Sequence, residues 1–357
     1  MSRFSTRRAR VATSLAALTL SALALSACAG GSADEATAAA DDESASHGDI
    51  TLQLSWIKNE EFAGEYFADS EGYYTEAGFD SVTLVPGPSG GIPEIMSGTA
   101  DISISDAVQA GAAIANEGAP IKIIGATFQA NPFTVLSLAD GGDIATPEDL
   151  KGKKIGVQDS NMTLFNALLD ANDIDPSELT IVPVQYDPAP LLNGEVDGFM
   201  AYLTNEAISV EMEGFATTNF PLAENGMPFV AEVFIVTDEK IASDREMLKA
   251  FLAAEIKGWT DAVNDAEAGA ALAVDVYGKD LGLDPEKAVA GSVAQNLLID
   301  TEETRENGLF TVSEKLQKET IATLERAGIT VTADVLFDMS LLAEVYEQYP
   351  ELIAYAG

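Results

Sequence analysis

The amino-acid sequence predicts an α/β protein built from two lobes with a hinge between them. From Ile50 to about residue 237, short β-branched runs alternate with helical segments, a pattern typical of largely parallel sheets covered by helices. After Asp238 the sequence becomes almost wholly helical. The chain of 357 residues contains one cysteine, so no intrachain disulfide can form and the hydrophobic core alone must hold the fold. We therefore expect two α/β lobes, with extra C-terminal helices on the first.

The N-terminal segment predicts export from the cell. Basic residues precede an apolar stretch, Val11–Leu25, that is too short to span a bilayer as a helix. We predict a signal peptide at 1–27, followed by a flexible tether without aromatic residues at 28–48. Leu25-Ser26-Ala27-Cys28 resembles the bacterial lipobox, which would make Cys28 a lipid-modified residue that anchors the protein to the outer face of the cell membrane. The alternative is an ordinary signal peptide in which Cys28 is incidental.

The first lobe is predicted to begin with four strands and the helices between them. The strands are expected at 50–56, 82–85, 101–105 and 121–128, and the helices near 61–77, 92–98 and 107–117. A second series of alternating strands and helices predicts the other lobe. Its strands are expected at 134–138, 154–157, 180–184, 198–202 and 229–237, and its helices near 162–172, 188–194 and 205–213.

The chain is expected to cross between the lobes near 129–133 and to return near 230–236. The first lobe would then contain 49–130 and 236–357, and the second 131–235. The C-terminal helices are predicted at 245–264, 267–277, 285–296 and 311–327, where apolar residues recur at three- and four-residue spacing. Pro285 at a helix start and Gly328 after a helix end fit the usual preferences of helix termini.

The composition excludes several kinds of chemistry. Cys28 and His47 are the only cysteine and histidine, and both are expected to lie outside the folded domain. Thiol nucleophiles, Ser-His and Cys-His pairs and nearly all zinc sites are therefore unavailable, and we expect no cofactor and no metal. Removing the predicted signal peptide with its four arginines changes the net charge from −39 to −43. This charge makes nucleic acid a poor partner and indicates either adaptation to a saline environment or a merely acidic, soluble surface.

Three patches at predicted strand ends hold the candidate binding residues. In the first, Trp56 closes a strand, and Asn59, Phe62 and Tyr66 follow on the next helix. Aromatic side chains in this arrangement suit stacking on a flat ring, although helix-face aromatics also pack into cores. The second patch contains Ser89 and Gly90 before a helix, with Ser105-Asp106 and Asn161 after the neighbouring strands. Backbone N–H groups there can hold a carbonyl or an anion, but the same residues also make ordinary turns and caps.

The third patch ends a buried strand with Tyr202 and continues to Asn205 and Glu206 at a helix start. A carboxylate at this position can accept hydrogen bonds from a heteroaromatic ring. The alternative is that Asn205 caps the helix and Glu206 is an ordinary first-turn acid. No arginine falls in the three patches, and Lys58 is their one cation, so an anionic ligand is disfavoured.

At these patches the chain resembles the solute-binding proteins of ABC importers for nitrate, alkanesulfonates, thiamine-precursor pyrimidines and riboflavin. The resemblance runs from about Ile50 to Ala266. It rests on Trp56…Asn59…Phe62-Ala63-Gly64…Tyr66, on Pro147–Val157, on Gly194–Gly198 and on Tyr202…Asn205-Glu206. It implies the type II solute-binding fold, which closes on its ligand by hinge bending.

Within that family, the pyrimidine and riboflavin branches fit best. They imply a ring stacked on Trp56 and facing Glu206. The sequence departs from the pyrimidine pattern at Phe62, where histidine is common, and at Lys58, where proline is usual, and this favours riboflavin-like ligands.

The predicted function is therefore the capture of a small, neutral, flat heteroaromatic compound and its delivery to a membrane permease. The expected partners are that ligand, the permease and ATPase subunits of an importer, and the membrane through the lipid anchor, with the protein itself a monomer. An alkanesulfonate- or nitrate-type binding protein is the alternative. A further alternative, from another class, is a pyrimidine-synthase-like or carboxylate-dependent enzyme. The resemblance implies that the related synthases use a histidine and cysteines, which the predicted folded domain lacks.

Overall fold

The computed structural model describes residues 46–87 and 91–355, which belong to one unit that begins at Ser44. The predicted signal peptide, Cys28 and nearly all of the predicted tether lie outside the described residues, as do Ser89 and Gly90. Within the described part of the chain, no helix is long and apolar enough to cross a membrane.

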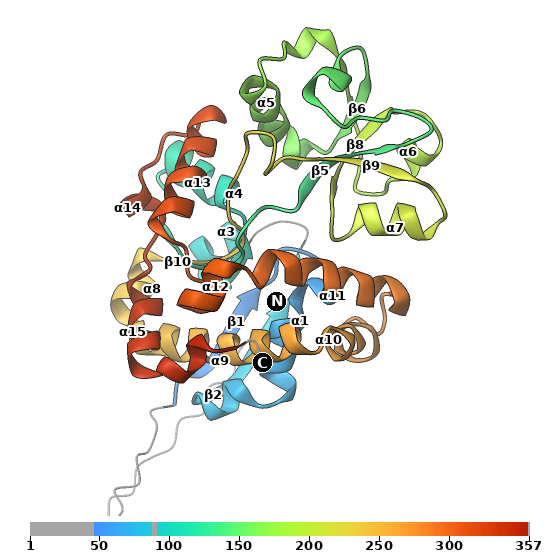
Figure 1. The fold of residues 1–357 in the computed structure, drawn as a ribbon. Coiled ribbons are helices and arrows are strands. Elements are labelled where there is room, and N and C mark those ends of the chain that lie inside the picture. The colour runs from blue at the N-terminus through green and yellow to red at the C-terminus, as the bar shows by residue number, and fades with distance from the viewer. Residues whose placement is uncertain (1–45, 88–90, 356–357) are drawn as a thin grey trace, which may run out of the picture. The chain divides into compact units, whose positions relative to one another are not determined.

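The first lobe is built on a mixed five-stranded sheet in the order β2-β1-β3-β10-β4 (Figure 1). Its strands are β1 (Gly48–Gln53), β2 (Phe79–Val85), β3 (Ile102–Ser105), β4 (Ile121–Phe128) and β10 (Ala231–Thr237). The first three strands run parallel, while β10 is antiparallel to both of its neighbours. Leu52, Ile102 and Ile123 are fully buried, because helices cover both faces of this sheet.

The second lobe repeats this topology in the order β7-β6-β8-β5-β9. Its strands are β5 (Phe133–Leu138), β6 (Lys154–Val157), β7 (Thr180–Pro183), β8 (Gly198–Tyr202) and β9 (Thr217–Pro221). Here β5 takes the antiparallel position that β10 takes in the first lobe. The expected two-lobed α/β architecture is confirmed, with a structural repeat that has no counterpart in the sequence.

Two short segments join the lobes, 129–132 between β4 and β5 and 222–230 between β9 and β10. The predicted limit of the second lobe at residue 235 was wrong, because β10 pairs with β3 and β4 in the first sheet. The return strand is therefore inserted into the sheet of the first lobe along its whole length.

Helices pack around the sheets. Those associated with the first sheet are η1 (Glu60–Phe62), α1 (Ala63–Ser70), α2 (Tyr73–Glu76), α3 (Ile92–Ser97), α4 (Ala107–Glu117), α8 (Asp238–Ser243), α9 (Arg245–Asn264), α10 (Ala266–Leu272), the π-helical turn η5 (Ala273–Tyr277), α11 (Pro285–Ile299), α12 (Glu302–Asn307), α13 (Glu314–Arg326), α14 (Ala333–Leu336), α15 (Ser340–Gln348) and η6 (Pro350–Ile353). The second lobe has η2 (Pro147–Leu150), η3 (Asp159–Asn161), α5 (Met162–Ala171), η4 (Pro176–Glu178), α6 (Ala189–Leu192) and α7 (Glu206–Met212).

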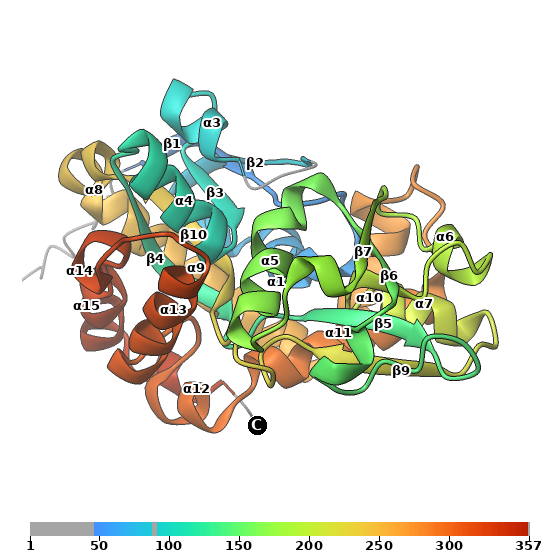
Figure 2. The same ribbon diagram turned by 90° about the horizontal axis from the view of Figure 1, so that it is seen from above.

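Two C-terminal helices reach the second lobe. Helix α11 lies beneath α7 in Figure 1, where the Lys287 ammonium donates a hydrogen bond to Asn205. Helix α13 packs against α5 (Figure 2). It also contacts the 222–230 segment, where the Thr323 hydroxyl donates a hydrogen bond to the Pro228 carbonyl. The C-terminal helices therefore do not rest on the first lobe alone, as the sequence predicted, but also brace the connection between the two.

Several predicted boundaries differ from the structure. β1 begins at Gly48, and the ring of His47 lies 5.3 Å from that of Phe79, so the histidine belongs to the folded unit and not to the tether. The strand ends at Gln53 and not at Trp56. The helix predicted at 61–77 is broken at Gly72, whose φ of +80° is left-handed.

Short elements escaped prediction altogether. These are β9, α8, α12, α14 and α15. Most of them have only four to six residues, too few for apolar spacing to identify.

Candidate functional site

A pocket lies between the two sheets, at the carboxyl ends of their parallel strands, where ligands bind in open α/β folds. It encloses about 740 Å³ of space between atoms, a volume that includes open solvent at its mouth. Its lining comes from both lobes: Ser55, Trp56, Glu61, Ser105, Asp106, Gln109, Phe133, Gln158, Ser160, Asn161, Tyr186, Met200, Ala201, Tyr202, Asn205, Glu206 and Glu232.

Aromatic rings from opposite lobes meet in this pocket. Trp56 follows β1, and Tyr186 follows β7 in the other lobe; their ring centroids are 4.7 Å apart at an angle of 62°. Phe133 and Tyr202 form a second edge-to-face pair at 4.6 Å. Such rings offer flat apolar surface for a planar ligand.

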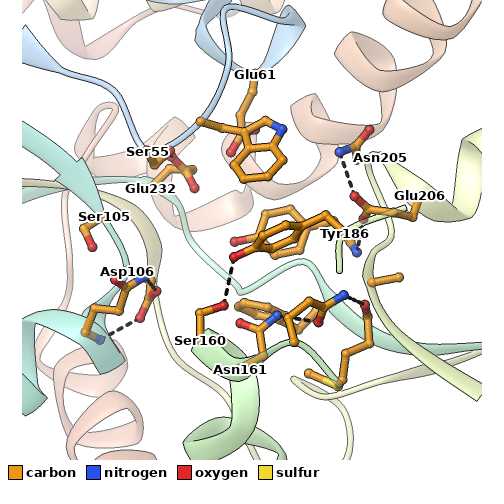
Figure 3. Close-up of a pocket in the computed structure, with 17 residues that line it drawn as sticks. Ser55, Glu61, Ser105, Asp106, Ser160, Asn161, Tyr186, Asn205, Glu206 and Glu232 are labelled. Atoms are coloured by element: carbon orange, nitrogen blue, oxygen red, sulfur yellow. Dashed lines mark hydrogen bonds between the residues drawn. The ribbon is translucent and has the colours of Figure 1, made fainter. Parts of the chain in front are cut away.

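The start of α7 presents a fixed carboxylate to the pocket (Figure 3). Glu206 accepts hydrogen bonds from the Tyr202 backbone N–H at 2.8 Å and from the Asn205 side-chain amide at 2.9 Å. Asn205 makes no capping hydrogen bond, so the interpretation of this residue as a simple helix cap is wrong. Burial raises the pKa of Glu206, while the hydrogen bond from Tyr202 opposes that rise.

Amide side chains are also held in place around the pocket. Gln158 donates a hydrogen bond to the Met200 carbonyl at 2.9 Å and accepts one from Asn161 at 2.9 Å. On the first lobe, Asp106 caps α4 by accepting the backbone N–H groups of Val108 and Gln109. Asp106 is therefore a helix cap that also lines the pocket, and its role in binding stays a prediction.

A pair of glutamates lies near Ser55 and Asp106 on one side of the pocket. Glu61 and Glu232 share a side-chain hydrogen bond, and Ser55 donates another to Glu232 at 2.8 Å. Burial raises the pKa of Glu61 well above its usual range, and the negative charge of Glu232 raises it further. Burial is also the main cause of the raised pKa of Glu232. Two carboxyls this close cannot both ionise easily, so the pair holds a proton.

The pocket has an acidic character. Four carboxyl groups line it, from Glu61, Asp106, Glu206 and Glu232, and no lysine or arginine is found among its described lining residues. Lys287 lies at its edge, where it forms an ion pair with Glu60 at 3.5 Å.

Most of the predicted site residues lie together in this pocket. Those that line it are Trp56, Ser105, Asp106, Asn161, Tyr202, Asn205 and Glu206. Three others are buried in the first lobe, outside the lining. Phe62 packs into its hydrophobic core, Tyr66 stacks on Tyr277 with centroids 4.2 Å apart, and Asn59 is buried before the η1 turn. Phe62 is therefore not placed to stack on a ligand beside Trp56, and the ring that meets Trp56 in the pocket is that of Tyr186.

Several lining residues were missed in the sequence. Tyr186 and Gln158 follow the carboxyl ends of strands that were predicted, so strand position alone was a sufficient signal. Glu61 and Glu232 carried no such signal, because the strand return that places Glu232 beside Glu61 brings together segments 171 residues apart in the numbering.

In the described part of the chain, no three or more histidine, cysteine, aspartate or glutamate side chains are arranged so that they could hold a metal ion. His47 precedes the amino end of β1, whereas the pocket is at its carboxyl end, a separation of about 20 Å for a six-residue strand.

The fold is that of the periplasmic binding proteins. The aliphatic sulphonate binding protein SsuA from Escherichia coli superimposes with a TM-score of 0.63 at 14% identity, over 81% of this chain and 96% of that one. The strand order, the two crossings and the pocket between the sheets thus define a two-lobed α/β protein of this class. Within it, the chain belongs to the NMT1/THI5-like family, whose pattern matches residues 59–268.

Curated relatives of two kinds share this region. The riboflavin-binding protein RibY of Chloroflexus aurantiacus is 24% identical over 227 residues, 59% of this chain and 62% of its own length. The 4-amino-5-hydroxymethyl-2-methylpyrimidine phosphate synthase of Schizosaccharomyces pombe is 28% identical over 230 residues, 60% of this chain and 66% of its own length. The chain therefore spans less than two thirds of either relative, and the relatives include both a binding protein and an enzyme.

Proposed function

We propose that this protein is the solute-binding component of an ABC importer and takes up a small flat heteroaromatic compound. The main support for this proposal is the carboxylate of Glu206, which Tyr202 and Asn205 orient in a pocket with aromatic rings from both lobes. A planar ring stacks on Trp56 and Tyr186, and its N–H groups donate to Glu206. A ligand without such donors leaves the buried carboxylate unpaired, which is the source of selectivity.

The candidate ligands are a riboflavin-like ring and a thiamine-precursor pyrimidine. RibY, the relative named for riboflavin binding, and the relatives named for pyrimidine synthesis support this pair of ligand classes. An alkanesulfonate or nitrate ligand is the weaker candidate, because four carboxyl groups and no described basic residue line the pocket.

The residue types that line the pocket favour transport over catalysis. The described lining contains neither histidine nor cysteine, the residue types on which the related synthases are expected to depend. We further propose that the predicted signal peptide exports the protein and that lipidation of Cys28 holds it at the outer face of the cell membrane. Closure of the lobes around the ligand would then present the loaded form to the permease.

The test is a calorimetric titration of the purified protein with riboflavin, 4-amino-5-hydroxymethyl-2-methylpyrimidine, ethanesulfonate and nitrate. We expect one of the heteroaromatic compounds to bind and the two anions not to bind. In Glu206→Gln the affinity should fall at least tenfold, equivalent to about 1.4 kcal/mol.

The matched control is Glu213→Gln, at the exposed C-terminal end of the same helix, which should bind as the wild type does. Binding of an anion in place of either heteroaromatic compound would overturn the proposal. Undiminished affinity in Glu206→Gln would remove this residue from the site.

A further inference from the structure

The paired carboxyls of Glu61 and Glu232 have no role in a pocket that binds a neutral ring at Glu206. Glu61 comes from the η1 turn of the first lobe, and Glu232 from β10, the strand that returns from the second lobe. Both line the pocket, and only 5% of Glu232 is exposed. Figure 3 shows them with Ser55 and Asp106 on the side of the pocket away from Glu206.

The backbone of Glu232 is held in an unfavourable conformation at this point. Its φ of +45° lies in the left-handed region, which non-glycine residues rarely adopt and which costs on the order of 1–3 kcal/mol. Glycine would remove that strain, yet the position carries a glutamate whose carboxyl lines the pocket. A strained residue within a paired strand therefore marks the placement of this carboxyl as functional.

A second polar group beside the pair lacks a partner. Ser105 lies opposite Val233 in the β3–β10 ladder, next to Glu232, and also lines the pocket. The residue is only 2% exposed, and its hydroxyl makes no hydrogen bond with any described residue. Buried hydroxyls normally have a partner, so this one is available to a bound ligand.

The ionisable groups around the pair are almost all acidic. The ionisable groups that act on Glu61 and Glu232 are Glu60 in η1, Glu65 in α1, Asp106 before α4, Tyr202 at the end of β8 and Glu206 in α7. The neighbouring cation, Lys287, is engaged by Glu60 and Asn205. A pocket with this surrounding charge stabilises a cation in preference to a neutral molecule or an anion.

We propose that Glu61 and Glu232 form the cation-accepting end of the pocket, where a positively charged nitrogen of the ligand displaces the proton that the two carboxyls share. This rests on the proposed function, because the same flat ring still stacks on Trp56 and Tyr186. The ligand class becomes a heteroaromatic base that is protonated in water, such as a ring bearing an amidine or amino group. The displaced proton leaves for solvent, and the Ser105 hydroxyl accepts one hydrogen bond from the charged N–H group.

The probes that test this are 9-aminoacridine, a flat cation at neutral pH, and riboflavin, a flat neutral molecule. Each is titrated calorimetrically in phosphate and in Tris buffers at pH 6, 7 and 8. For 9-aminoacridine we expect the apparent enthalpy to differ between buffers, because a proton is released, and the affinity to rise by up to about tenfold per pH unit. For riboflavin we expect neither effect.

Glu61→Gln and Glu232→Gln should each abolish proton release, since an amide keeps the shape of the protonated carboxyl but has no proton to exchange. Two variants are used so that a folding defect in one leaves the other informative. Glu71→Gln is the control, an exposed acid at the C-terminal end of α1 that does not line the pocket, and should keep the proton release.

The outcomes separate the two proposals. If riboflavin binds, and 9-aminoacridine binds no more tightly and releases no proton, the proposed function stands but the cation site is overturned. Proton release that persists in both Gln variants would also overturn it. If neither probe binds, the cation site is overturned, and the proposed function then depends on the titration with 4-amino-5-hydroxymethyl-2-methylpyrimidine.

Discussion

Trp56 and Tyr186 illustrate how single residues from the two lobes make one binding surface. Each follows the carboxyl end of a parallel strand, β1 inside one sheet and the edge strand β7 in the other. Both rings are only partly buried, although Trp56 also packs against the core of the first lobe, whereas Trp259 is fully buried at the contact of α1 and α9. The two tryptophans of the chain thus have separate environments, and only one reports on the pocket.

Replacing Trp56 should separate its stacking contribution from its fluorescence. In Trp56→Phe, quenching of tryptophan fluorescence by ligand should disappear while most of the affinity remains. In Trp56→Ala the affinity should fall by about 5- to 150-fold, the equivalent of 1–3 kcal/mol of lost stacking. The control Trp259→Phe should retain the quenching, and wild-type affinity in Trp56→Ala would place the ligand elsewhere.

The residue scale also shows what the sequence can and cannot reveal about a site. Trp56, Tyr202 and Glu206 were predicted because each follows a recognisable strand, and strand ends converge in this kind of fold. Phe62 and Tyr66 were assigned wrongly because their helix turns them into the core, and one sequence gives no way to tell which face is covered. Glu232 was missed because its role depends on a strand that crosses back from the other lobe.

At the scale of elements, the contact between α1 and α9 contains acids without countercharges. The helices approach closely, since a Cβ on Gly258 would lie 2.2 Å from the Gly64 carbonyl. Glu65 and Glu255 are fully buried at this contact, where Tyr74 donates a hydrogen bond to Glu255. Burial raises the pKa of Glu65 to about 8 and that of Glu255 well above its usual range. Both side chains are therefore protonated in the folded protein near neutral pH.

This burial should make the protein less stable as the pH rises. In the unfolded chain Glu65 ionises near 4.5, whereas in the folded protein it keeps its proton to about pH 8. Between these values the folded state binds more protons, so the free energy of unfolding falls by up to about 1.4 kcal/mol per pH unit for this group. Urea denaturation at pH 5, 6, 7 and 8 measures the slope.

Glu65→Gln should reduce that slope by the contribution of one proton, leaving the part due to Glu255, Glu61 and Glu232. Glu71→Gln, exposed at the C-terminal end of α1, is the control and should follow the wild type. An equal slope in Glu65→Gln and the wild type would mean that Glu65 is ionised in the folded protein.

The elements were easier to predict than their connections. β4, β6 and β8 begin and end at the predicted residues, because short runs of β-branched, aromatic or other apolar residues bounded by turns identify buried strands. The edge strand β9 was missed, since Thr217–Pro221 contains two threonines, an asparagine and a proline and only one fully buried residue. The membership of β10 in the first sheet depends on pairing with β3 and β4, which no local pattern contains.

At the scale of the whole molecule, contacts between the lobes occur on two sides of the described structure. Lys287 on α11 meets Asn205 at the start of α7, and α13 packs against α5. The first contact joins a positive side chain to the residue that orients Glu206. Movement of the lobes would therefore alter the position of the binding carboxylate, which links closure to recognition.

The net charge of −39 over 357 residues acts on the whole molecule and predicts a response to salt. The nineteen basic side chains cannot neutralise the fifty-eight acidic ones, so the folded state carries like charges at close spacing. Screening shortens the reach of that repulsion from about 10 Å at 0.1 M salt to about 3 Å at 1 M. We expect the melting temperature to rise between 0.1 and 1 M NaCl, measured by calorimetry or circular dichroism. Choline chloride should give the same rise if screening is the cause, whereas a rise with NaCl alone would indicate bound sodium. A flat or falling curve in both salts would show that the acidic surface serves solubility and that adaptation to saline conditions is the wrong explanation.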